Sequence, residues 1–123
     1  MITKSSRAMF YAHVFARRGM SKSYALRYGW MMVSLRTALQ NGILRFRFVK
    51  TNGDIRDAKG TLHPLLIPDD KHPKDTLPLQ GKGRERGFHT IAFFDLDKQE
   101  WRSFRITDFE EVLEAFVIKE VML

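Results

Sequence analysis

The chain has 123 residues, 44% of them hydrophobic, no cysteine and a formal net charge of +7. This composition predicts one globular domain with a modest core, and it excludes disulfide bonds and thiolate metal sites. No apolar run approaches the roughly 20 residues that span a membrane, and Arg17 and Arg18 interrupt the apolar N-terminal positions, so we expect a cytoplasmic protein without a signal peptide or a membrane partner.

Two helices are predicted in residues 1–42, as a helical hairpin. The first ends at Gly19, which can adopt the left-handed conformation of a helix stop. The second begins after Ser21 and ends at Gly42, and its apolar residues recur at steps of three and four, which places them on one buried face. That face consists of Ala25, Tyr28, Met32, Leu35 and Leu39. Gly29, inside the same helix, indicates close packing or a kink.

Residues 43–106 are predicted to form an SH3/Sm-like barrel of four to five short strands. The segment 44–49 alternates apolar and basic residues, as a half-buried strand does. Asn52-Gly53 then predicts a tight type I′ hairpin turn, because both residues tolerate positive φ. Gly60, in the middle of the return strand, indicates a bulge or a sharp bend.

A long connection, a second strand pair and a final helix complete the prediction. Residues 68–87 contain three prolines, three glycines and nine charged residues, so we expect an exposed, mobile loop. Two strands follow, in 89–94 and 101–106. Residues 107–123 are predicted to form a C-terminal helix whose buried side consists of Phe109, Val112, Leu113 and Phe116. Because so few strands bury little as a flat sheet, we predict an α+β fold, one compact domain in which helices cover a barrel.

The positive charge is concentrated at the N-terminal end. Residues 1–42 contain seven Lys or Arg and no Asp or Glu, residues 43–107 contain 13 basic and nine acidic residues, and residues 108–123 contain one basic and five acidic residues. A segment of this length without a carboxylate suits a polyanionic partner such as nucleic acid. Chance and ordinary solubility are the alternatives.

The strand region resembles a family of small SH3-type β-barrel proteins of phages and mobile elements in gut bacteria. Two motifs within about residues 43–106 carry the resemblance, a G-x-x-R-x-A-x-G-T-L-x-P run and the sequence FFDLDKxEWRSFR. In this chain the first motif consists of Gly53, Arg56, Ala58, Gly60, Thr61, Leu62 and Pro64. The second is the more specific, since its aromatic and basic residues follow an acidic turn at fixed spacing. The resemblance implies the fold far more than a function.

The second motif also resembles the end of the WYL domain, an SH3/Sm-like barrel that acts as a ligand sensor in bacterial regulators. WYL domains close with an R-x-F-R strand, which is matched here by Arg102, Phe104 and Arg105. The resemblance implies nucleic acids or nucleotides as ligands and the two arginines as anion contacts.

The first candidate site is the strand that carries Trp101, Arg102 and Arg105. Arginine binds phosphate with two parallel hydrogen bonds, and an indole can stack on a base. The alternative is that both arginines pair with acidic residues of the preceding turn and merely close the barrel. Arg45 and Arg47, on the polar face of the first strand, would join this surface if the two strands were neighbours; otherwise they are ordinary solvent-facing residues.

The second candidate site surrounds the turn between the two predicted helices. Four basic residues flank this turn, namely Arg17, Arg18, Lys22 and Arg27. A helix, a glycine, a serine and a second helix are loosely similar to a helix-turn-helix, whose second helix enters a major groove. Non-specific phosphate contact and a helical hairpin that only packs on the barrel are the alternatives.

The sequence shows no nucleophile, base and orienting acid arranged for catalysis, and its histidine spacings fit no metal-ligand pattern. We therefore expect a non-enzymatic protein without metal or cofactor. The leading hypothesis is an accessory or regulatory protein, encoded by a phage or mobile element, that binds nucleic acid or a nucleotide. The alternative is a protein-interaction or virion-associated component that docks on an acidic protein partner or self-associates, in the host cytoplasm or the virion.

Overall fold

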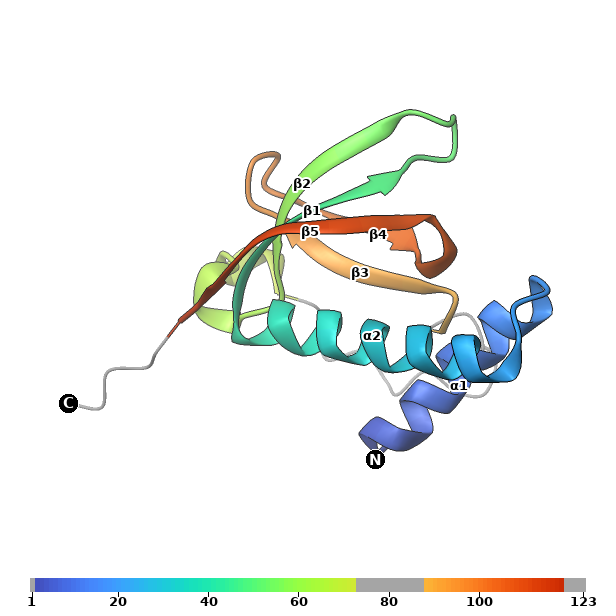
Figure 1. The fold of residues 1–123 in the computed structure, drawn as a ribbon. Coiled ribbons are helices and arrows are strands. Elements are labelled where there is room, and N and C mark those ends of the chain that lie inside the picture. Colours follow the sequence, from blue (N-terminus) through green and yellow to red (C-terminus); the bar gives the residue numbers. More distant parts are fainter. Residues whose placement is uncertain (1, 73–87, 119–123) are drawn as a thin grey trace.

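The computed structural model describes residues 2–72 and 88–118, and it confirms an α+β fold with two N-terminal helices followed by five antiparallel strands. The helices form a hairpin on one side of the sheet (Figure 1). The elements are α1 (Lys4–Arg17), α2 (Lys22–Asn41), β1 (Gly42–Val49), β2 (Ile55–Thr61), β3 (Thr90–Asp95), β4 (Glu100–Arg105) and β5 (Phe109–Val117). The described residues between strands include the short 3-10 helices Pro64–Leu66, Asp69–Lys71 and Ile106–Asp108.

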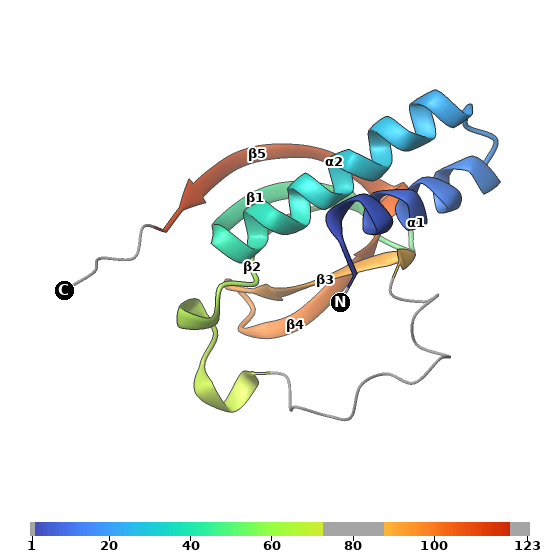
Figure 2. The same cartoon turned by 90° about the horizontal axis from the view of Figure 1, so that it is seen from below.

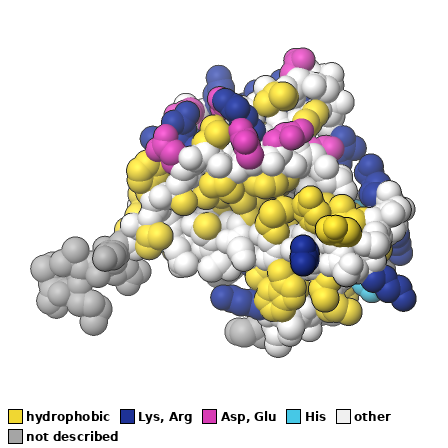
Figure 3. Space-filling view, in the orientation of Figure 1, with side chains coloured by type: hydrophobic (Ala, Val, Ile, Leu, Met, Phe, Trp, Pro, Cys, Tyr) yellow, Lys and Arg dark blue, Asp and Glu magenta, His cyan; other side chains and the backbone are white. Residues whose placement is uncertain are grey.

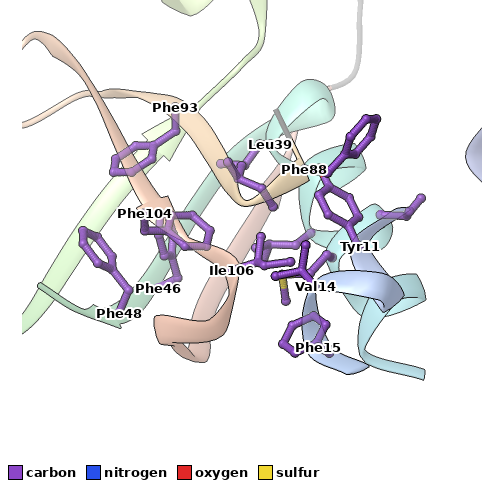
Figure 4. Close-up of a cluster of buried hydrophobic side chains, with 14 of the residues drawn as sticks. Tyr11, Val14, Phe15, Leu39, Phe46, Phe48, Phe88, Phe93, Phe104 and Ile106 are labelled. Atoms are coloured by element: carbon purple, nitrogen blue, oxygen red, sulfur yellow. The ribbon is translucent and has the colours of Figure 1, made fainter. Parts of the chain in front are cut away.

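The sheet has the order β4-β3-β2-β1-β5 and curls upon itself. Although β2 and β3 separate β1 from β4, the rings of Phe46 and Phe48 on β1 lie 5.3 and 5.4 Å from the ring of Phe104 on β4. The ring of Phe93 on β3 lies 5.1 Å from Phe46 and completes the cluster (Figure 4). Such contacts require the two halves of the sheet to face one another across the core, as they do in Figure 2.

Helix α2 closes the open side of the curled sheet. Its buried residues Met32, Leu35 and Leu39 join the same core cluster as the strand phenylalanines. At its C-terminal end the carbonyl of Leu39 accepts a hydrogen bond of 2.8 Å from the backbone N–H of Leu62. The predicted buried stripe is therefore correct except for Tyr28, which is 40% exposed.

Gly29 allows α1 to pack closely against α2. A Cβ atom at this position would lie 2.3 Å from the backbone oxygen of Ala8 on α1. The sequence indicated either close packing or a kink at Gly29, and the structure shows close packing.

The structure confirms a tight hairpin turn between β1 and β2, but only one of its two predicted positive φ angles. Gly53 has φ +92°, whereas Asn52 does not have positive φ. The N–H of Gly53 donates to the carbonyl of Lys50, and the N–H of Lys50 donates to the carbonyl of Asp54. The turn is therefore not type I′. A three-residue loop that ends in a left-handed glycine matches the twist of the strands equally well.

Replacing Gly53 with valine is expected to lower the free energy of unfolding by about 1 kcal/mol or more, because a β-branched residue is strained at positive φ. Gly53→Asn should cost clearly less, since asparagine tolerates the left-handed region. Urea denaturation of the two variants measures the difference. Equal stability of the valine variant and the wild type would mean that the turn rearranges at no cost.

Gly60 makes no bulge. The register between β1 and β2 runs without a shift from Ile43↔Thr61 to Val49↔Ile55, and a Cβ at Gly60 would lie 2.5 Å from the ring of Phe93. The glycine thus leaves room for an aromatic ring over the backbone. The register irregularities of the sheet lie instead between β1 and β5.

The predicted C-terminal helix in 107–123 is wrong over Phe109–Val117. Residues Phe109–Val117 form β5, antiparallel to β1. The three- and four-residue spacing of the apolar residues suggested a helix, but Val112 and Phe116 are 47% and 49% exposed. Pairing satisfies the backbone groups that β1 presents on the side away from β2, which no local helix could do.

The expected mobile loop 68–87 is ordered in its first part. Asp69–Lys71 forms a 3-10 helix, and the carbonyl of Lys71 accepts a hydrogen bond from the indole of Trp101. The rest of this loop, residues 73–87, lies outside the described residues.

Candidate nucleic-acid interface

The arginines of β4 are engaged with carboxylates. Nε of Arg102 lies 3.3 Å from Oδ2 of the buried Asp95, and its Nη2 lies 2.6 Å from Oε1 of Glu100. Nε of Arg105 donates to Oδ2 of Asp108 at 2.7 Å. These pairings are the structural alternative that the sequence left open, with Asp108 as a partner outside the preceding turn.

Trp101 also has a structural role. Its Nε1–H donates to the carbonyl of Lys71 at 2.6 Å, and its ring meets the ring of Phe94 edge-on at 5.7 Å. The half-buried indole therefore fastens the segment after β2 to the sheet. A base that stacked on the same ring would have to compete with these contacts.

The arginines of β1 are engaged in the same way. Arg45 pairs with Glu114 on β5 at 3.0 Å. Arg47 pairs with Asp57 on β2 at 2.6 Å and with Glu111 on β5 at 3.0 Å. The hydrogen bond that Arg47 donates to Asp57, and then the charge of Asp57, raise the pKa of Arg47. Because β1 and β4 are not neighbours, the four arginines do not form the single surface that the sequence suggested.

The basic residues of the helical hairpin are in a different situation. None of Arg17, Arg18, Lys22 and Arg27 forms an ion pair within residues 2–72 and 88–118. The guanidinium of Arg27 lies 5.9 Å from the ring centroid of Tyr24. Positive charge around the turn between α1 and α2 is thus left uncompensated by the described part of the chain.

Arg7 and Arg36 add to this charge, and sequence reasoning did not single them out. Arg36 of α2 is half-buried, and burial, followed by the nearby charge of Arg7 on α1, lowers its pKa. Arg7 itself lies over the ring of Phe88, 5.3 Å from the centroid. Only the packing of α1 against α2 brings the two cations together, so no sequence pattern could have shown their proximity.

Aromatic side chains lie between the cations on the outer face of α2. Tyr24, Tyr28 and Met31, with Arg27, line a shallow depression on this helix. These three apolar side chains are between 38% and 57% exposed. Figure 3 shows that hydrophobic side chains gather over the helices, whereas basic and acidic side chains alternate over the sheet. The aromatic and basic residues of α2 thus form one mixed surface.

A larger cleft adjoins this surface, between the helical hairpin and the start of β5. It has a volume of about 550 Å³, and it shares Tyr28 and Met31 with the shallow depression. Phe15 and Arg18 of the hairpin and Phe109 and Glu110 of β5 line its other sides. The sequence prediction of a C-terminal helix concealed this cleft, because residues Phe109–Val117 form strand β5 instead, with Phe109 both packed against the core and lining the cleft.

The second half of α2 cannot act as an independent recognition helix. Met32, Leu35 and Leu39 are buried in the domain core, so this half of α2 is fixed against the sheet and exposes only the opposite face, which includes Ser34. This arrangement favours contact with phosphates over the major-groove reading that a helix-turn-helix performs.

Other features of the described residues point to no further chemistry. Within 2–72 and 88–118, metal-binding side chains do not come together in groups of three or more. His63 and His72 contact the backbone of their own segment, since Nδ1 of His63 accepts from the N–H of Leu65 and the ring of His72 lies 2.9 Å from the carbonyl of Ile67. No helix in this part of the chain is long and apolar enough to cross a bilayer.

The curled sheet and its family match define the class of protein. Residues 32–110 match the family model described as WYL_2, with an Sm-like SH3 beta-barrel fold. The domain is therefore an Sm-like SH3 barrel, which confirms the predicted fold and the resemblance to WYL-type barrels. Because the match covers more than half of the chain, the protein belongs to the WYL_2 family. No curated protein and no solved structure matches the chain.

The matched range does not include the turn of the helical hairpin. It begins within α2 and ends at the start of β5. The sheet arginines at 45, 47, 102 and 105 lie inside the range, whereas the hairpin cations at 17, 18, 22 and 27 lie outside it. The four ion-paired sheet arginines thus belong to the family barrel. The four hairpin cations, which have no ion-pair partner among the described residues, precede the match.

Proposed function

We propose that this protein is a non-enzymatic, nucleic-acid-binding accessory or regulatory protein, and that the helical hairpin is its phosphate-binding surface. The observation that carries the proposal is the contrast in charge pairing. The candidate arginines of the sheet have carboxylate partners, whereas the hairpin cations have none among the described residues. A surface that already satisfies its own charges gains little from phosphate, while an unpaired cation releases counterions when it binds one.

The aromatic residues between the cations favour nucleic acid over an acidic protein. A base can stack on an exposed tyrosine while the neighbouring cation contacts the backbone phosphate. The guanidinium carbon of Arg27 already lies 5.9 Å from the ring centroid of Tyr24. An acidic protein surface would use the cations but would have no general need for exposed aromatic rings.

The resemblance to small barrels of phages and mobile elements supplies the setting that we propose. In such a setting a cytoplasmic binding module of this size would act beside larger nucleic-acid enzymes or regulators. The second candidate, docking on an acidic protein or a virion component, uses the same hairpin cations and is separated from the first by the experiment below.

We expect the double variant Lys22→Ala/Arg27→Ala to weaken binding of a fluorescent single-stranded oligonucleotide. Each lost phosphate contact should reduce the slope of log K against log salt by about 0.7, hence by about 1.4 for the two. Fluorescence anisotropy from about 50 to 200 mM salt measures this slope.

The matched control is Arg45→Ala/Arg105→Ala, which removes two arginines that are 43% and 48% exposed and ion-paired on the sheet. This control has the same change in net charge and should leave the slope nearly unchanged. Equal effects of both double variants would show that only net charge matters and would contradict the assignment to the hairpin. Failure of the wild type to bind any oligonucleotide at low salt would favour the acidic protein partner.

A further inference from the structure

The cleft between the helical hairpin and β5 has features that phosphate binding alone does not use. Its volume of about 550 Å³ is within the range of small-ligand sites. Phosphate contacts require only exposed cations, whereas the lining of this cleft combines aromatic and thioether side chains with polar groups in about equal measure. A surface that served only the backbone of a nucleic acid would not need such a hollow.

The walls of the cleft suit a flat, apolar ring. Tyr28 projects from α2 and Phe15 from α1, with their ring centroids 5.4 Å apart. Phe109 faces the cleft from the start of β5, and the side chains of Met20 and Met31 complete the lining. Aromatic faces bind a nucleobase by stacking, and thioethers adapt to its irregular outline.

The two charged groups of the lining have opposite sign and come from opposite elements. Arg18 belongs to the turn of the helical hairpin and Glu110 belongs to β5. Neither side chain has an ion-pair partner among residues 2–72 and 88–118. The guanidinium can donate to a phosphate, while the carboxylate can only accept hydrogen bonds. A ligand that complements both groups carries an anion and, beyond its ring, an N–H donor.

We propose that this cleft binds one unstacked base of a single-stranded nucleic acid, and that it prefers bases with an exocyclic amino group. The inference rests on the proposed function, because the strand reaches the cleft along the hairpin cations. Glu110 accepts from the amino group of cytosine or adenine, whereas thymine and uracil present a carbonyl oxygen there, which the carboxylate repels. Arg18 binds the phosphate of the same nucleotide.

Duplex nucleic acid cannot use the cleft in this way. Its bases are stacked on both faces, so no ring face is free to contact Tyr28 or Phe109. An unstacked base has free faces for Tyr28 and Phe109 and a free edge for Glu110, as in other single-strand recognition. The cleft therefore makes the domain selective for single strands, beyond the general attraction of its positive charge.

The first experiment compares a single-stranded oligo-dC of about 12 nucleotides with a blunt duplex of the same length. Wild type should bind the single strand more tightly, and Tyr28→Leu should weaken single-strand binding about fivefold or more without changing duplex binding. The control is Trp30→Leu, because Trp30 is 42% exposed on α2, close to the 40% of Tyr28, but does not line the cleft. Trp30→Leu should leave single-strand binding unchanged.

The second experiment uses Glu110→Gln to test whether Glu110 accepts a hydrogen bond from the amino group of the base. Wild type should bind oligo-dC about fivefold or more tightly than oligo-dT, and this ratio should fall towards one in the variant, because a glutamine amide donates as well as accepts. Glu111→Gln is the matched control, since the neighbouring Glu111 pairs with Arg47 on the sheet. It changes the net charge equally and should leave the ratio unchanged. Glu110 is exposed, so its variant remains informative even if Tyr28→Leu does not fold.

The outcomes separate the inference from the proposed function. Single-strand binding that depends on Lys22 and Arg27 but tolerates Tyr28→Leu would overturn the base-binding cleft and leave the phosphate surface intact. Equal affinity for oligo-dC and oligo-dT in the wild type would overturn the role of Glu110 in the same way. No salt-dependent binding of any oligonucleotide would overturn the proposed function and this inference together.

Discussion

Replacing Gly29 with leucine is expected to lower the free energy of unfolding by about 3 kcal/mol, and Gly29→Ala by about 1 to 2 kcal/mol. In an exposed helix alanine would instead stabilise by up to about 1 kcal/mol relative to glycine. Here the first added atom would lie 2.3 Å from the backbone oxygen of Ala8, and a backbone oxygen cannot move aside as a flexible side chain can. The two helices must therefore separate, which loosens the packing of Ala8 and Val33 in the core.

Urea denaturation followed by far-ultraviolet circular dichroism measures both variants. Ser34→Ala is the control, because Ser34 is exposed on the same helix and its replacement should be neutral or slightly stabilising. A stabilising Gly29→Ala would show that α1 does not pack closely on α2 at this point. That result would also remove the support on which the arrangement of the hairpin cations depends.

Asp95→Ala is expected to lower the free energy of unfolding by about 2 to 3 kcal/mol, the range for lost hydrogen bonds to a charged group. The carboxylate of Asp95 is buried at the end of β3. Its Oδ1 accepts from the N–H groups of Asp97 and Lys98 at 2.9 and 3.0 Å, which shapes the turn to β4. Its Oδ2 faces Nε of Arg102 at 3.3 Å, so the variant also leaves a partly buried guanidinium with one partner fewer.

A double-mutant cycle with Arg102→Ala separates these two contributions. We expect an interaction energy of about 1 kcal/mol between Asp95 and Arg102, because residues in one ion-pair network are not additive. Asp97→Ala serves as the control, since Asp97 is exposed and its change should stay within about 0.5 kcal/mol. Full additivity of Asp95 and Arg102 would mean that the turn hydrogen bonds alone account for the effect. Glu100, 2.6 Å from Nη2 of Arg102, would then be the carboxylate that holds the guanidinium.

The sequence and the tertiary structure contribute different information about the candidate site. The excess of positive charge in residues 1–42 is a property of the sequence alone, and so are the four cations around the helical turn. The W-R-x-F-R motif of β4 was an equally strong candidate in the sequence. In the structure its indole donates to a backbone carbonyl and its two arginines pair with carboxylates of the barrel. A motif shows which residue types recur together, and it does not show whether a carboxylate from a distant strand neutralises them.

Local chemistry determined the elements that depend on neighbouring residues. Gly19 and Gly53 have φ of +94° and +92°, and both mark the ends of elements that the sequence predicted. The alternation of β1 likewise follows from its own sequence, with Leu44, Phe46 and Phe48 buried. In each case a few adjacent residues supply the whole physical cause, which is backbone freedom at the glycines and burial of every second side chain along the strand.

Only the tertiary structure decided the state of residues 109–117. Their apolar spacing fits a helix, but the unpaired backbone of β1 offers hydrogen bonds along the whole segment, and Arg45 and Arg47 offer charges to Glu114 and Glu111. A strand partner 60 or more residues away contributes nothing to local propensity, so the sequence pattern could not reveal it. The same pairing brings Phe109 and Glu110 opposite the helical hairpin and thereby creates the cleft.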